Sequence, residues 1–140
     1  MKILVPVDGS AFTKRALAYL AAHEEWLGPQ HHYTLLHVVP AVPPRAASVF
    51  TKEDLQSYYD EEAEKVFAPL RSFFSQQQLS AEFIGKVGHA AEVIAEVGSE
   101  GDHDLVLMGS HGHSSLGNLV LGSVANKVLA QTKLPVLLIR

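Results

Sequence analysis

The sequence predicts a single α/β domain in which a parallel sheet carries helices on both faces. Short apolar runs alternate along the chain with segments of helical period, in the order βαβαβαβαβ, and this alternation is typical of a parallel sheet. The chain has 140 residues, of which 47% are hydrophobic, which suffices for one core but is short for two domains. We therefore expect residues 1–140 to form one doubly wound domain around a five-stranded sheet.

The first third of the chain predicts two strands with a helix between them. Ile3 to Val7 is an apolar run rich in β-branched residues, and Asp8-Gly9-Ser10 ends it. The helix that follows is expected to end at Gly28-Pro29, and Tyr33 to Val39 is the second strand. The apolar stripe of that helix consists of Ala16, Leu17, Leu20 and Ala21.

A proline-rich segment and a long charged helix come next. Pro40 to Ala47 holds three prolines without a clear period, which predicts a loop that can serve as a lid. Thr51 is expected to cap the following helix, with Asp54 three residues on as in a capping box. We expect that helix to reach about Gln77 and to be bent or interrupted near Pro69.

The second half repeats the alternation. Ala81 to Val87 predicts a strand, Ala90 to Val97 a helix and Leu105 to Met108 a further strand. Pro135 to Ile139 is the last strand. The first and fourth apolar runs lack polar residues, as is usual for central strands covered on both faces. The helix before the last strand is marked by Val124, Ala125, Val128 and Leu129.

Composition excludes several classes of protein. The net charge is −4 and no Lys/Arg cluster stands out, so we expect no nucleic-acid partner and no membrane partner. Cysteine is absent, which excludes disulfides, thiolate zinc sites and a cysteine nucleophile. The first apolar run is too short for a signal peptide, and none approaches the roughly 20 residues of a membrane span. We expect a soluble cytoplasmic protein.

The segment Gly109 to Ser123 follows the fourth strand, at the sheet edge where α/β proteins bind ligands. Its four glycines let an anion approach the backbone, its serines offer hydroxyl donors, and it runs into a helix N-terminus. These features predict a phosphate cradle, although such loops also serve simply as turns. Asn118-Leu119 stands where a Walker A motif needs Lys-Ser/Thr, so that motif is absent.

The spacing Gly109-x2-Gly112-x9-Gly122-Ser123 resembles the signature of the universal stress protein family in its ATP-binding branch. The resemblance includes Val124 after the serine and extends from Lys2 to Arg140. It implies a flavodoxin-like sheet, similar to the adenine nucleotide α-hydrolases, with strand order 3-2-1-4-5. It also implies ATP with Mg or Mn in the cleft between strands one and four, and a homodimer through the strand Pro135 to Ile139.

The resemblance assigns a role to each matching position. Asp8 would meet the ribose or a phosphate-bound metal, and Val38 would touch the adenine. The floor of the site would be Pro6 and Val7, with Met108 and Val124 beside the phosphates. The phosphates would be held by Gly109, Gly112, Gly122 and Ser123.

Each of these candidates also has a plainer interpretation. Asp8 could cap the first helix, and Ser123 could be only the N-cap of its own helix. We expect His37 to be a satisfied core residue. His111 or His113 could donate to a phosphate, but the pair lacks a third ligand, so a structural metal site is not expected.

No Lys or Arg lies between Asp104 and Asn126, whereas fast phosphoryl transfer needs cations on the developing charge. The sequence therefore favours a regulatory nucleotide-binding protein that holds ATP over an enzyme that consumes it. Two alternatives remain open: a slow ATPase or adenylate-handling enzyme, and a dimeric scaffold without nucleotide.

Overall fold

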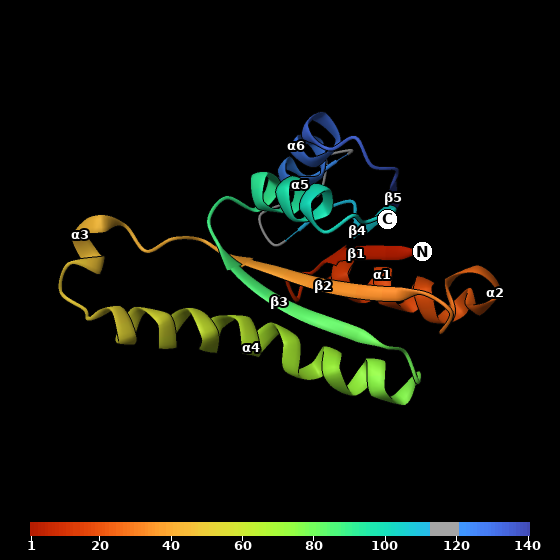
Figure 1. Cartoon of the computed structure of the whole chain (residues 1–140), viewed down its shortest axis with the longest axis horizontal. Helices are drawn as coiled ribbons and strands as arrows, with labels where there is room; N and C mark the ends of the chain where they lie inside the picture. Colours follow the sequence, from red (N-terminus) through yellow and green to blue (C-terminus); the bar gives the residue numbers. More distant parts are fainter. Residues whose placement is uncertain (113–120) are drawn as a thin grey trace.

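The computed structural model describes residues 1–112 and 121–140, and its centre is a parallel sheet (Figure 1). The sheet has five strands in the order β3-β2-β1-β4-β5, and each neighbouring pair is parallel. This order confirms the predicted fold class. The strands are β1 (Lys2–Pro6), β2 (His32–Val39), β3 (Ala81–Val87), β4 (Leu105–Gly109) and β5 (Val136–Ile139).

The helices of the described residues cover both faces of this sheet (Figure 1). On one face α1 lies over β4 and β5, and α4 lies over β2 and β3. On the other face α5 and α6 pack against each other. The helices are α1 (Ala11–Ala22), α2 (Glu24–Leu27), α3 (Pro44–Ala47), α4 (Lys52–Gln76), α5 (Ala90–Glu100) and α6 (Ser123–Gln131).

The side chains of β1 show why the domain needs helices on both faces. Ile3 and Val5 enter the core under α1 and α4, whereas Leu4 enters the core under α5 and α6. Successive residues of a strand point to opposite faces, so an all-apolar strand must be covered twice. All three side chains are 0% exposed, which places β1 at the centre of the molecule.

Two short helices correct one predicted helix boundary and one predicted loop. The helix expected to reach Gly28-Pro29 ends at Ala22, and α2 forms a separate turn before the glycine. The segment Pro40 to Ala47, predicted as a loop, ends in α3 because Pro44 occupies its first turn, where the fixed φ of proline favours a helix. The lid function of this segment stays a prediction.

The helix α4 confirms one expectation and corrects another. Thr51 is its N-cap, and its hydroxyl accepts a hydrogen bond from the Asp54 backbone N–H at 3.0 Å. Pro69 lies inside the helix, but the helix continues through it to Gln76. Phe67 and Leu70, on either side of the proline, are both buried, so packing on the sheet offsets the lost backbone hydrogen bond.

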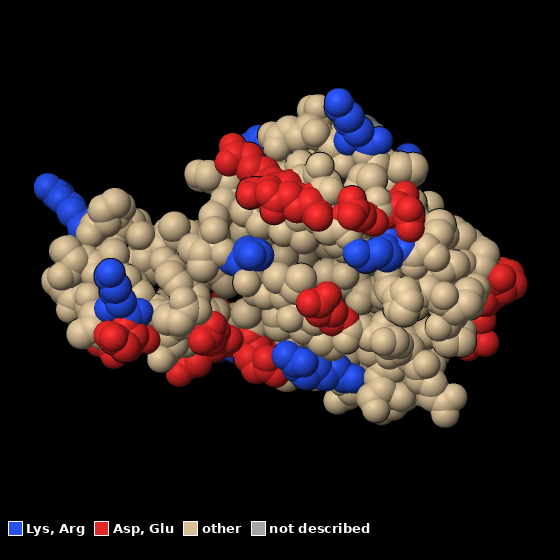
Figure 2. Space-filling view, viewed as in Figure 1, with Lys and Arg blue, Asp and Glu red and all other residues tan. Residues whose placement is uncertain are grey.

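The surface view shows how the charges are distributed on one face. Lys and Arg are scattered there, whereas acidic side chains form a row over α5 (Figure 2). This helix carries Glu92, Glu96 and Glu100 at successive i, i+4 positions, and all three are exposed. Within the described ranges, no helix combines the length and apolar character that crossing a membrane requires.

Candidate functional site

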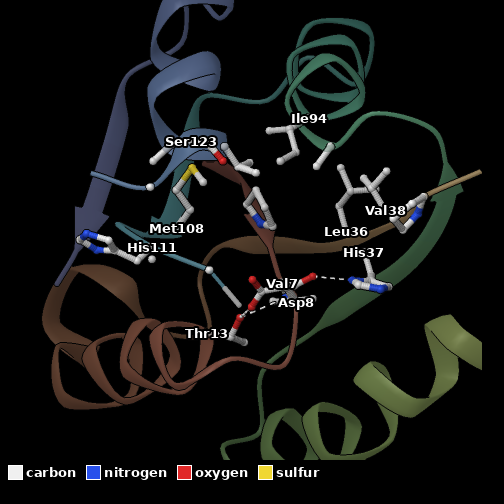
Figure 3. Close-up of a pocket in the computed structure, with 18 residues that line it drawn as sticks. Val7, Asp8, Thr13, Leu36, His37, Val38, Ile94, Met108, His111 and Ser123 are labelled. Atoms are coloured by element: carbon white, nitrogen blue, oxygen red, sulfur yellow. Dashed lines mark hydrogen bonds between the residues drawn. The ribbon is translucent and has the colours of Figure 1, made fainter. Parts of the chain in front are cut away.

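A cavity of about 300 Å³ opens where the carboxyl ends of β1, β2 and β4 meet (Figure 3). This is the sheet edge at which α/β domains usually bind ligands. The structure brings all of the predicted site residues to this one cavity. They are Pro6, Val7, Asp8, Val38, Met108, Gly109, His111, Gly112, Gly122, Ser123 and Val124.

Sequence reasoning missed seven other residues that line the cavity. Ala90 and Ile94 come from the first turns of α5, whose apolar stripe was assigned to the core alone. Thr13 comes from the first turn of α1, and its role depends on the direction of its side chain, which the sequence does not reveal. The remaining four are Leu36, His37, Pro40 and Ala125.

The carboxylate of Asp8 is held by the turn between β1 and α1 (Figure 3). The Thr13 hydroxyl donates to Asp8 Oδ1 at 2.8 Å, and the Ser10 backbone N–H donates to the same oxygen at 2.9 Å. In return, the Asp8 backbone N–H donates to Thr13 Oγ1 at 3.0 Å. The side-chain N-cap of α1 is Ser10, so the interpretation of Asp8 as that cap is wrong.

Two signature glycines lie where a side chain would collide with the site. A Cβ on Gly112 would come within 2.6 Å of Asp8 Oδ2. A Cβ on Gly109 would come within 2.6 Å of the Phe12 Cβ in α1. Real Cβ atoms essentially never approach other heavy atoms so closely. A side chain at position 109 would collide with the Cβ and backbone of Phe12, whereas one at position 112 would force the Asp8 carboxylate to move. Gly112 lets the backbone approach Asp8, and Gly109 lets β4 end against α1.

The N-terminus of α6 faces the cavity. Gly122 is its N-cap and makes no side-chain capping bond, which corrects the expectation that Ser123 is the cap. Ser123 is instead the first helical residue, and with Val124 and Ala125 it lines the cavity. The first N–H groups of a helix have no partner within it and carry a partial positive charge. This end of the cavity therefore suits an anion.

Histidines lie at two sides of the cavity. His37 Nδ1 lies 2.7 Å from the Val7 carbonyl oxygen, and since a carbonyl only accepts, the ring nitrogen donates. This bond confirms that His37 is a satisfied residue, although it also lines the cavity. His111 Nδ1 lies 2.8 Å from the buried Ser110 hydroxyl, and its ring packs against Phe12 with centroids 4.8 Å apart.

The charge of the cavity is low. Among its described lining residues Asp8 is the acid, and neither Lys nor Arg is present. The described part of the chain contains no group of three His, Asp or Glu side chains able to hold a metal by themselves. A cation here would need ligand atoms from a bound phosphate or water as well as from Asp8. The prediction on His113 falls outside the described residues.

The chain is similar to known proteins over its whole length. The profile of the Universal stress protein family matches residues 1–140. A Thermus aquaticus protein, "Universal stress protein in QAH/OAS sulfhydrylase 3'region", is 33% identical over 138 residues, covering 99% of this chain and 97% of that protein.

Solved structures agree with this match. Protein MJ0577 of Methanocaldococcus jannaschii has a TM-score of 0.78 and 26% identity, covering 99% of this chain and 94% of that one. A universal stress protein from Archaeoglobus fulgidus, solved in complex with dAMP, has a TM-score of 0.69 and 22% identity. That similarity covers 100% of this chain and 98% of the other, and at this identity it bears on the fold alone.

Proposed function

The chain belongs to the universal stress protein family, and from this premise we propose that it is a regulatory protein that binds ATP with Mg or Mn. The observation that carries the proposal is the convergence of the glycine loop, the α6 N-terminus and Asp8 on one cavity. The volume of about 300 Å³ lies at the lower end of small-molecule sites. The ligand class proposed here, an adenine nucleotide, is the one present in the Archaeoglobus fulgidus structure of the same fold, which was solved in complex with dAMP.

The lining residues match the parts of a nucleotide in chemical character. The adenine would lie against the apolar side chains of Val38 and Ile94, with Pro6 and Val7 as the floor. Asp8 would accept from the ribose hydroxyls or bind the metal on the phosphates. The phosphates would lie on backbone N–H groups of the glycine signature and of the α6 N-terminus.

The same lining argues against rapid ATP hydrolysis. Phosphoryl transfer is accelerated by cations placed on the transferring group and by a positioned nucleophile. The described residues around the cavity supply neither Lys nor Arg, so the developing charge would rest on hydrogen bonds and one metal ion. We therefore propose binding over turnover. A slow ATPase or adenylate-handling enzyme and a nucleotide-free scaffold are the alternatives that experiments must separate.

Two further parts of the proposal concern assembly and location. The strand β5 lies at the edge of the sheet, and its backbone groups on the outer side are open to pairing with a second copy. We propose a homodimer through Pro135 to Ile139, in the cytoplasm and without a nucleic-acid partner. Light scattering at micromolar concentration tests the dimer, and a monomer would contradict it.

The decisive experiment identifies the nucleotide directly. Acid extraction of the freshly purified protein, followed by chromatography, should release adenine nucleotide, and Mg-ATP should raise the melting temperature of the stripped protein. Mn-ATP, Mg-ADP and AMP serve as comparisons for the metal and the phosphates. The absence of both copurified nucleotide and a thermal shift would favour the scaffold. Release of phosphate well above about 1 per minute would favour an enzyme, since typical enzymes turn over about 10 times per second.

A further inference from the structure

A second cavity lies between α1 and α4, on the face of the sheet away from α5 and α6. Its volume is about 570 Å³, within the usual range for small-molecule sites. It shares only Asp8 and Thr13 with the cavity described above. The residues that line it are Asp8, Gly9, Thr13, Lys14, Leu17, Ala18, Lys65, Val66, Pro69, Leu70 and Phe73.

The arrangement of the two helices explains this groove. Because α1 lies over β4 and β5 while α4 lies over β2 and β3, the two helices are set apart above the middle of the sheet. The α4 wall runs from Lys65 to Phe73 along one face of the helix, which is about 12 Å at 1.5 Å per residue. The buried Leu17 and Leu70 belong to the core beneath, and Val66 and Phe73 are only partly buried.

The groove is apolar along its length but has cations at its rim. Lys14 and Lys65 stand on opposite helices, and both are exposed. Lys65 Nζ lies 2.7 Å from Glu62 Oε1, so its charge is partly compensated. Lys14 forms no ion pair with any described carboxylate. The acid at the end of the groove, Asp8, already accepts two hydrogen bonds on Oδ1.

We propose that the α1/α4 groove binds an amphiphile with an alkyl chain of medium length and an anionic head group. The chain would lie along the apolar walls between Leu17 and Val66, and the head group would lie beside the Lys14 ammonium. The α4 wall of the groove is only about 12 Å long. It therefore offers little surface to a second copy of the chain, because a stable protein interface buries about 800 Å² on each partner. This proposal does not rest on the proposed nucleotide function, although the groove shares Asp8 and Thr13 with the first cavity.

The probe is decanoate, used below its micelle concentration and titrated calorimetrically into the full chain, with decanol as the uncharged comparison. We expect saturable binding of both probes. Lys14→Gln should weaken decanoate binding about two- to fivefold, because that is what one exposed ion pair contributes to an affinity. The same substitution should leave the affinity for decanol unchanged. Lys127→Gln removes an exposed lysine on α6 and should change neither. Ala18→Phe fills the groove from the exposed side of α1 and should abolish binding of both probes.

Four results would overturn the proposal. Decanoate that does not bind, or that binds equally to the Ala18→Phe variant, excludes the groove as its site. Complete displacement of decanoate by Mg-ATP would place the amphiphile in the nucleotide cavity instead. A dimer that dissociates in the Ala18→Phe variant would make the groove an interface between copies. Nucleotide binding is measured separately by thermal shift, so loss of one site is distinguishable from loss of the other.

Discussion

The hydrogen bonds between Asp8 and Thr13 give a sharp test of how the site is built. Thr13 is 4% exposed, and its hydroxyl both donates to Asp8 Oδ1 at 2.8 Å and accepts from the Asp8 N–H at 3.0 Å. In the Thr13→Val variant the side chain keeps its shape, so packing is preserved. Both hydrogen bonds are lost, and the Asp8 backbone N–H is left without its acceptor.

The size of the effect follows from these two contacts. A hydrogen bond to a charged group contributes about 1.5–3 kcal/mol, and an unsatisfied buried donor costs about 1–3 kcal/mol. Asp8 is only partly buried, so water recovers some of this loss. We expect the variant to lose about 2–4 kcal/mol of unfolding free energy, which corresponds to a fall in melting temperature of about 6–15 °C.

Urea unfolding followed by Trp26 fluorescence measures this directly, because Trp26 is the single tryptophan of the chain. The control is Thr13→Ser, which keeps the hydroxyl and should lose less than half as much stability. The affinity for Mg-ATP should also fall in the valine variant and recover in the serine variant, since the hydroxyl aims the Asp8 carboxylate. A valine variant whose unfolding free energy lies within about 0.5 kcal/mol of the parent, the usual effect of a neutral surface change, would contradict the role assigned to the Thr13 hydroxyl.

The remaining predictions use other features of the structure. Gly112→Ala should at least halve the thermal shift by Mg-ATP, because the new Cβ would lie 2.6 Å from Asp8 Oδ2 and displace it; an unchanged shift would contradict the assigned contact. Burial raises the pKa of Tyr33 from 10.0 to about 12, so the folded state keeps a proton that the unfolded state releases. The unfolding free energy should therefore fall between pH 10 and 12, by up to about 3 kcal/mol, in urea titrations, and Tyr33→Phe should lack this component. Removing divalent ions with EDTA should weaken the proposed ATP binding about tenfold or more in calorimetry, because the described lining residues include no Lys or Arg to balance the phosphates; unchanged affinity would exclude a bound metal.

The hydrophobic pattern predicted the sheet because it reports burial directly. Ile3, Leu4 and Val5 form a continuous apolar run, and only a strand covered on both faces buries all three. The pattern could not exclude a break at Pro69, since α4 stays continuous there through the packing of its buried neighbours on parts of the chain that are distant in sequence. The short helix α3 was missed because its four residues bury no side chain and leave no apolar period.

Part of the candidate site could also be predicted from the sequence. The glycine spacing marked the loop, since glycine is needed where Gly112 approaches Asp8. The role of Thr13 was not visible, because it depends on the direction in which a side chain in the first turn of α1 points. The α1/α4 groove was invisible for a different reason: it arises from the separation of two helices on the sheet, which neither helix encodes alone.

The start of the glycine loop is tied to the last strand. The Ser110 backbone N–H donates to the Ile139 carbonyl at 2.8 Å, and Gly109 pairs with Ile139 in the register of β4 and β5. On the ribosome, the turn around Asp8 is made first and can close through contacts only five residues apart. On the opposite side of the cavity, the Ser110 backbone N–H gains its acceptor only when Ile139 has been added. A nascent chain should therefore complete this cavity late, after almost all of the sheet has been synthesised.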